Sequence, residues 1–140
     1  MPIQHEILEP GAVLHTILIG RVTDDELLAY YWPTPPRSPG SPWREVVDGT
    51  AATEIAVTIA GQTRLVARTA PHAELLKGAR VAMVATNDAM FGMFRQRELG
   101  REGLGYRVRV FREREAALAW VRGPAEASAP GEPSAGGRSL

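Results

Sequence analysis

Residues 80–85 form the apolar run that most constrains how this 140-residue chain folds. The run reads Arg-Val-Ala-Met-Val-Ala, and small and branched apolar residues without polar alternation favour a strand buried on both faces. Asn87 or Asp88 then caps a helix that has a broad apolar face and ends at Gly100. Because a buried strand followed directly by a helix is half of a βαβ unit, the sequence predicts an α/β fold with parallel pairing.

The flanking segments continue this alternation of strands and helices. The turn at Pro10 and Gly11 predicts an N-terminal antiparallel hairpin. We therefore expect a mixed sheet of about four or five strands, with the hairpin at one edge and helices packed on the sheet. The other expected elements are strands at residues 3–8 and 13–19, a helix from Thr23, short extended pieces at 45–48 and 54–57, helices at 58–68 and 71–77, a half-exposed strand at 106–111 and a helix at 113–122.

One domain is expected, spanning residues 1–122. Residues 123–140 are almost entirely Gly, Pro, Ala, Ser and Glu, and a segment with so little apolar surface is predicted to be a disordered tail. Five prolines between Trp32 and Trp43 remove backbone donors, so residues 32–43 are predicted to form a surface loop.

Several kinds of chemistry are excluded or disfavoured by composition. The chain has no cysteine, which excludes disulfides, thiolate metal sites and a cysteine nucleophile. Sixteen basic residues balance sixteen acidic ones, so no overall field favours nucleic acid or a membrane. The longest uncharged apolar stretch, residues 11–20, covers half a membrane span, and the start resembles no signal peptide. We expect a soluble, cytoplasmic protein.

No catalytic or metal-binding motif is present in the sequence. His5, His15 and His72 lie far apart in the chain and in the expected elements, and they lack metal-ligand spacing. No phosphate-binding loop, dinucleotide fingerprint or nucleophile elbow occurs either. We therefore expect no enzyme activity, no metal and no cofactor.

The order of motifs after residue 80 resembles the SpoIIAA-like family of the STAS superfamily. An apolar strand and an acidic cap lead to Phe91-Gly92-x-x-Arg95, then to Val110-Phe111-Arg112, then to an Ala-x-x-Trp helix ending in Trp120. Upstream, residues 20–24 and 46–48 are similar to that family's first strand-to-helix turn and second core strand. The resemblance covers residues 5–122. It implies a sheet with helices packed on it, no catalytic constellation, and roles in partner binding or small-ligand sensing.

The resemblance also suggests a regulatory residue. In the anti-sigma-factor antagonists of the superfamily, a serine or threonine at the start of the second main helix is phosphorylated to block partner binding. Thr58 is the position that looks equivalent, although Val57 stands where the family often has an acidic residue. Thr58 is therefore a candidate phospho-acceptor, and the alternative is that it is a plain helix N-cap.

Candidate binding residues follow from the expected topology, because sites in such sheets lie beyond the carboxyl ends of parallel strands. Each candidate has a structural alternative: a strand-end carboxylate can bond nearby backbone, cap residues need no further function, and Gly92 can serve close helix–sheet packing. The candidates are Asp48, Asn87, Asp88, Phe91 and Arg95.

Arginine is concentrated near the C-terminal end of the predicted domain. Residues 95–114 contain seven arginines against three glutamates. A basic face of this kind can attract an acidic partner, but without interleaved aromatic residues or a known motif we expect a solvated face and no nucleic-acid partner.

The function expected from these features is a non-enzymatic regulatory or protein-interaction module with an unidentified protein partner. The alternative is a small-ligand or lipid-binding module of the same fold, suggested by flexible apolar side chains. A homodimer is also predicted, from the exposed edge at residues 3–8 and from Trp32 and Trp43. The residues behind the ligand alternative are Met83, Met90, Phe91, Met93 and Phe94.

Overall fold

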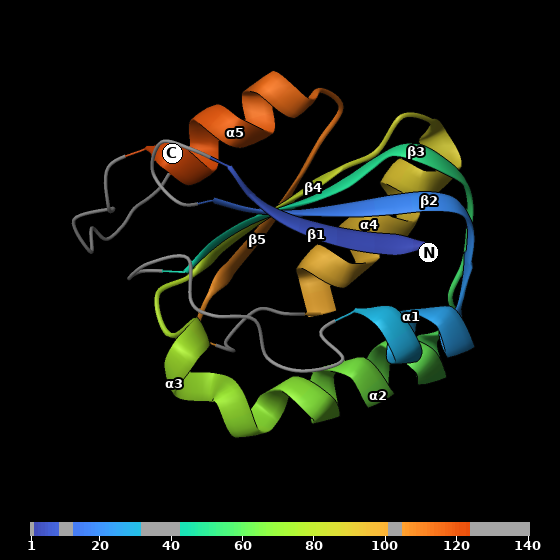
Figure 1. Ribbon diagram of the computed structural model, residues 1–140, viewed down its shortest axis with the longest axis horizontal. Coiled ribbons are helices and arrows are strands. Elements are labelled where there is room, and N and C mark those ends of the chain that lie inside the picture. The colour runs from blue at the N-terminus through green and yellow to red at the C-terminus, as the bar shows by residue number, and fades with distance from the viewer. Residues whose placement is uncertain (1, 9–12, 32–42, 101–104, 124–140) are drawn as a thin grey trace.

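A single five-stranded sheet organises the computed structural model, which describes residues 2–8, 13–31, 43–100 and 105–123 (Figure 1). The strands lie in sequence order across the sheet. The first two pair antiparallel and all others pair parallel, which confirms the predicted mixed sheet with an antiparallel edge. The strands are β1 (Ile3–Leu8), β2 (Val13–Thr23), β3 (Arg44–Ala56), β4 (Arg80–Val84) and β5 (Arg107–Phe111).

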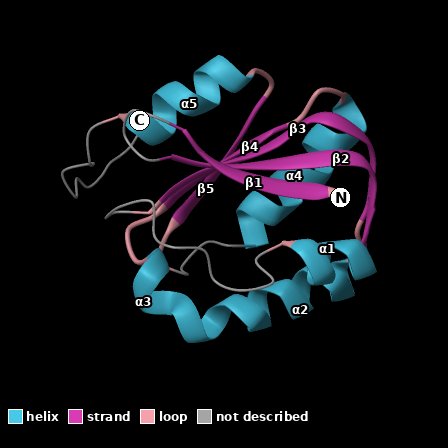
Figure 2. Cartoon of the chain, in the orientation of Figure 1, coloured by secondary structure: helices cyan, strands magenta, loops and turns pink. Residues whose placement is uncertain are grey.

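The helices divide unequally between the two faces of the sheet (Figure 2). One face carries α5 alone, and the other carries the remaining helices. None of the helices within the described ranges is long and apolar enough to cross a membrane. The helices are α1 (Asp24–Tyr30), α2 (Ile59–Thr69), the 3-10 turn η1 (Ala70–His72), α3 (Ala73–Leu76), α4 (Asp88–Gly100) and α5 (Arg114–Arg122).

The alternation of side chains along each strand builds a core on both faces. On β4 every residue is buried, as the unbroken apolar run from residue 80 predicts. Val81 and Met83 pack toward α4, whereas Ala82 and Val84 pack toward α5. Burying a large apolar side chain contributes about 1.5–3 kcal/mol, so these two layers hold the sheet and its helices together.

The structure corrects the predicted course of β3. Residues 45–48 and 54–57 were expected as separate extended pieces, but residues 45–48 and 54–56 belong to one strand, Arg44–Ala56. Gly49 lies between them because α4 approaches the sheet closely there. A Cβ atom on Gly49 would lie 2.6 Å from the Val84 carbonyl oxygen and 2.7 Å from the Met90 sulfur. Gly49 is therefore a contact point between the sheet and α4.

β2 also extends beyond its predicted end. Residues 13–19 were expected, and the strand continues to Thr23. Its pairing with β3 shifts register between Ile17 and Ile19 and again after Gly20, which has a φ of 68°. These irregularities let β2 carry on past the glycine, and they bring Thr23 opposite Ala56. The predicted tail and most of the Pro-rich loop lie outside the described residues.

Candidate functional site

Thr58 is the N-cap of α2 and lies against the start of α1. Its hydroxyl oxygen accepts from the Gly61 amide at 3.0 Å, and the hydroxyl donates to Oδ2 of Asp24 at 2.6 Å. The Thr58 amide donates to Oδ1 of the same carboxylate at 2.8 Å. The first turn of α2 is therefore satisfied jointly by a hydroxyl and by a carboxylate from another helix.

Strand pairing explains why these two helices begin side by side. Thr23, at the end of β2, lies opposite Ala56, at the end of β3. The two parallel strands therefore finish side by side at the same end of the sheet. Thr23 and Glu26 form a capping box at the start of α1, the helix expected from Thr23. Gly61 is needed for the close approach, because a Cβ atom there would overlap the Asp24 carboxylate.

An exposed isoleucine follows the cap. Ile59 is 76% exposed, and the other large hydrophobic residue that the described ranges leave exposed is Ile7, on β1, at 46%. Asp24 and Thr58 are hydrogen-bonded to each other, and the exposed Ile59 follows Thr58 directly in the chain. We call these three residues the α2 entry surface.

The candidates on α4 form a separate group. Asn87 caps α4, since its Oδ1 accepts from the Met90 amide at 2.9 Å. Asp88 pairs with Arg112 at 2.8 Å, and the Arg112 guanidinium lies 4.1 Å from the Phe91 ring centroid. Arg112, which follows β5, thus covers the half-buried Phe91, and Arg95 lies exposed one turn further along α4.

Two further observations concern the packing of α4 and its neighbours. Gly92 is exposed, and a Cβ atom added to it would have nothing within 4 Å, so close packing does not explain this glycine. Met83, Met90 and Phe94 are buried in the core, and Phe91 and Met93 pack partly buried against it. Core packing therefore accounts for the residues that suggested a flexible ligand pocket.

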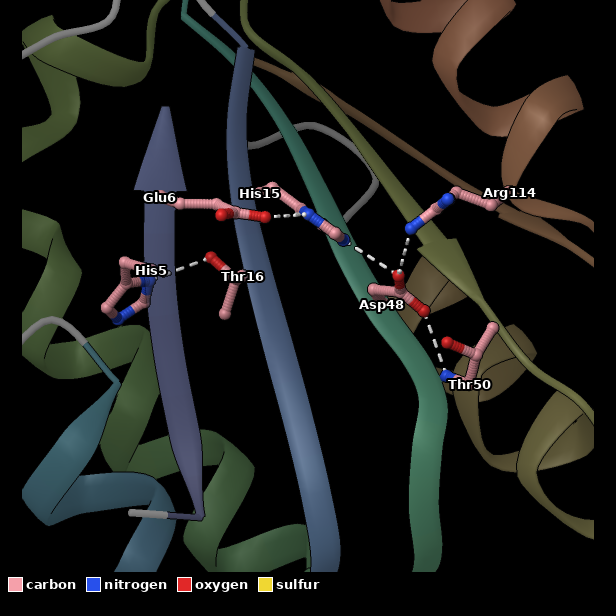
Figure 3. A network of polar contacts seen from close by, with 7 residues as sticks. All are labelled: His5, Glu6, His15, Thr16, Asp48, Thr50 and Arg114. Carbon is pink, nitrogen blue, oxygen red and sulfur yellow. Dashed lines mark hydrogen bonds and ion pairs between the residues drawn. The ribbon is translucent and has the colours of Figure 1, made fainter. Parts of the chain in front are cut away.

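Asp48 lies on the opposite face, in a polar network that the sequence did not reveal (Figure 3). Nε2 of His15 donates to Oδ2 of Asp48 at 2.7 Å, and Nδ1 of His15 donates to Oε2 of Glu6 at 2.9 Å. The Thr50 amide donates to Oδ1 of Asp48 at 2.9 Å, and Arg114 lies 3.8 Å away. The nearby backbone bond was expected, but the histidine and the arginine were not.

Electrostatic interactions favour the charged forms of the two buried residues in this network, His15 and Asp48. Each ring nitrogen of His15 faces a carboxylate, so both donate when the ring is protonated. The hydrogen bond to Asp48 raises the pKa of His15, and burial opposes it. Burial opposes ionisation of Asp48, but hydrogen bonds from His15 and Thr50 outweigh it and lower the pKa of Asp48 to about 2. Because both ring nitrogens of His15 are hydrogen-bonded to carboxylates, neither is available to accept a proton from a substrate. The arrangement is that of a structural ion cluster.

A second network lies on the other face of the same strands. Glu45 is only 1% exposed, and its carboxylate accepts from the Thr16 hydroxyl at 2.6 Å, the Tyr31 hydroxyl at 2.8 Å and the Trp43 indole at 3.2 Å. Thr16 also contacts Nδ1 of His5 at 3.0 Å, and this nitrogen donates because Thr16 already donates to Glu45. Burial raises the pKa of Glu45, and the three hydrogen bonds oppose the rise.

These networks correct two expectations. His5 and His15, which looked unrelated, lie on adjacent strands with their side chains on opposite faces. Trp43 is 1% exposed, so it offers no surface for the predicted homodimer. β1 is an edge strand, as expected, and the dimer stays a prediction that rests on this edge. Among the described side chains, no group of three or more histidine or acidic residues is arranged to hold a metal ion.

The fold and its comparisons agree on the class of this chain, a mixed α/β sheet domain with one antiparallel edge strand. No family model and no curated protein matches it. Among solved structures, it is similar to an uncharacterised DUF3478-family protein with a SpoIIAA-like fold from Shewanella loihica PV-4. The TM-score is 0.54 at 15% identity, over 85% of this chain and 91% of that one. The chain has a SpoIIAA-like fold, which confirms the fold that the sequence resemblance implies.

Proposed function

We propose that this chain is a non-enzymatic protein-interaction module that docks its partner through the α2 entry surface. The observation that carries the proposal is the exposure of Ile59 directly after the cap residue Thr58. A fully buried isoleucine is more stable than an exposed one by about 1.5–3 kcal/mol. Docking that covers Ile59 would recover this free energy.

The charges around Ile59 define the chemistry of the partner. The first turn of α1 carries Asp24, Asp25 and Glu26, and Asp24 reaches the start of α2. An apolar residue beside acidic groups suits a partner that has an apolar pocket with lysine or arginine at its rim. We therefore propose a protein partner with a basic, apolar docking site.

Thr58 is the proposed switch for this docking. Its hydroxyl lies 2.6 Å from a carboxylate oxygen of Asp24, so a phosphate on Thr58 would bring two negative groups together and break their hydrogen bonds. The SpoIIAA-like family often has an acidic residue directly before the phosphorylated hydroxyl, where this chain has Val57. Here Asp24, from another helix, places an acidic group beside Thr58. Repulsion between the phosphate and Asp24 would separate the starts of α1 and α2, so the α2 entry surface would lose its shape and release the partner despite the added negative charge.

Quantitative affinity purification from the native cell tests the docking site. Ile59→Asp removes the apolar centre, and Ile7→Asp is the matched control because it makes the same change at the other exposed isoleucine. We expect a partner that wild type and Ile7→Asp retain equally and Ile59→Asp loses. Equal retention by all three proteins would rule out docking through this surface.

Two substitutions at position 58 test the switch separately. Thr58→Ser keeps the cap and the hydroxyl, so it should bind the partner as wild type does. Thr58→Asp places a second carboxylate beside Asp24 and should weaken binding at a temperature at which it remains folded. Unchanged affinity in Thr58→Asp, with no phosphorylated species in the intact mass of native protein, would leave Thr58 as a cap alone.

A further inference from the structure

His15 lies between two carboxylates that differ in their access to water (Figure 3). Its Nδ1 faces Oε2 of Glu6 at 2.9 Å, and its Nε2 faces Oδ2 of Asp48 at 2.7 Å. The side chain of Glu6 is 53% exposed, whereas that of Asp48 is 2% exposed. Loss of one ring proton therefore has different consequences on the two sides of the histidine.

The proton on Nε2 is the more strongly held of the two. Hydrogen bonds lower the pKa of Asp48 to about 2, so this carboxylate stays charged while the histidine titrates. The Arg114 guanidinium, at 3.8 Å from Oδ2, is too far away to replace the bond from His15. A buried charged acceptor without a donor is costly, whereas water can satisfy the exposed Glu6. Deprotonation of the ring therefore removes the proton on Nδ1.

A bare Nδ1 repels the carboxylate of Glu6. Both atoms are then hydrogen-bond acceptors, and no proton lies between them. Glu6 can turn into water, but His15 is only 3% exposed and keeps its place within β2. The two residues are directly opposite each other in the register of β1 and β2. Deprotonation thus turns an attractive cross-strand pair into a repulsive one at the edge of the sheet.

We propose that His15 is a proton-controlled latch on the edge strand β1. The protonated ring holds Glu6 and ties β1 to β2. The neutral ring releases Glu6 and loosens β1, while its remaining bond to Asp48 keeps β2 joined to β3. This latch concerns the opposite end of the chain's first strand pair and is independent of docking through Ile59.

The charged groups around the ring set the pH at which the latch opens. They are Glu6 from β1, Asp48 from β3 and, beyond Asp48, Arg114 from α5. The bond to Asp48 raises the pKa of His15 above 6.5, although burial opposes the rise. Arginine stays protonated throughout this range. The latch is therefore closed at pH 6.5 and opens as the pH rises further.

Nitrogen-15 NMR of the full chain tests which proton leaves. Ring nitrogen shifts report the protonation of each nitrogen, and His15→Gln assigns the signals of His15 by removing them. We expect both nitrogens to be protonated at about pH 6 and only Nε2 at about pH 9. Loss of the Nε2 proton instead, or a ring whose protonation does not change over this range, would overturn the proposal.

Hydrogen exchange tests the consequence for β1. The Ile19 amide donates to the Pro2 carbonyl oxygen at 2.7 Å, and alternate pairs of an antiparallel ladder are hydrogen-bonded in this way. The amides of Gln4, Glu6 and Leu8 therefore point toward β2. After correction for intrinsic exchange rates, their protection should fall by about two- to fivefold when the latch opens, which is the size of one cross-strand pair.

Two matched variants separate the latch from a general loss of charge. A glutamine at position 6 can accept from a protonated Nδ1 or donate to a bare one, so in Glu6→Gln the protection of β1 should no longer fall with pH. Glu54→Gln removes the same charge from another exposed cross-strand pair, with Arg21, and should keep the wild-type response. An equal fall in wild type and Glu6→Gln, or no fall in wild type, would overturn the latch.

Discussion

Nε2 of His15 donates to Oδ2 of Asp48 at 2.7 Å, and this bond joins the side chains of β2 and β3 on the face that α5 covers. Glu6 extends the network to the edge strand, and Arg114 extends it to the first turn of α5. One buried ion pair thus links three strands and a helix (Figure 3).

Removing one charge from this pair should destabilise the protein strongly. In Asp48→Asn, the buried His15 loses its carboxylate partner, and breaking a buried pair from one side costs about 3–5 kcal/mol. The Glu6 side chain is 53% exposed, so Glu6→Gln should cost at most about 1 kcal/mol. Urea denaturation of the two variants checks this order. A smaller loss in Asp48→Asn than in Glu6→Gln would contradict the assigned network.

The same network predicts how stability changes with pH. The pKa of His15 is raised above 6.5 by its bond to Asp48, so its contribution is complete below 6.5 and is lost as the pH rises through the folded-state pKa. The pKa of Asp48 falls from 3.8 to about 2, so its contribution is complete above 3.8 and is lost as the pH falls toward 2. The contribution of the His15–Asp48 pair to the free energy of unfolding should therefore be highest between about pH 4 and 6.5.

His15→Gln separates this effect from other groups that titrate. Burial also raises the pKa of Glu45 above 4.5, which adds its own loss of stability as the pH rises. Denaturant titrations at mildly acidic and alkaline pH should show a smaller alkaline loss in His15→Gln than in wild type. Identical pH profiles for the two proteins would mean that His15 is not protonated in the folded state.

The tyrosine that donates to buried Glu45 gives a third prediction. Tyr31→Phe removes one of three donors to a carboxylate, and a hydrogen bond to a charged group contributes about 1.5–3 kcal/mol. Tyr30→Phe is the matched control, because the Tyr30 contact within this network uses its backbone carbonyl and not its hydroxyl. Equal unfolding free energies of the two variants in urea would argue against the bond between Tyr31 and Glu45.

Two glycines should respond to alanine in opposite directions. Gly49→Ala places a Cβ atom 2.6 Å from the Val84 carbonyl oxygen, and overpacking of this kind costs about 1–3 kcal/mol. Gly92→Ala meets open space on an exposed helical turn and should stabilise the protein by up to about 1 kcal/mol. Melting temperatures that shift in the same direction would contradict the described packing of α4.

The sequence predicted the succession of strands and helices along the chain and most helix boundaries, because local patterns carry that information. The run at residues 80–85 and the cap at Asn87 are readable without tertiary contacts. The continuity of β3 through Gly49 was missed, because the close approach of Met90 that this glycine permits is a contact between residues far apart in the sequence. Local sequence propensity does not indicate a contact of this kind.

The buried networks were missed for a related reason. A hairpin whose strands end at Leu8 and begin at Val13 pairs Glu6 with His15 and His5 with Thr16, so an exact loop length would have revealed half of each network. The other half, Asp48 and Glu45, depends on parallel pairing between β2 and β3. Register between parallel strands is not set by a short turn, so it could not be derived from the sequence.

Photo-crosslinking from position 59 tests the central proposal most directly. A photoreactive residue replaces Ile59 in one protein and Ile7 in a second, and both are expressed in the native cell. We predict that one partner protein is crosslinked from position 59 and not from position 7, and that Thr58→Asp reduces its yield. Equal crosslinking from both positions, or none from position 59, would contradict docking through the α2 entry surface.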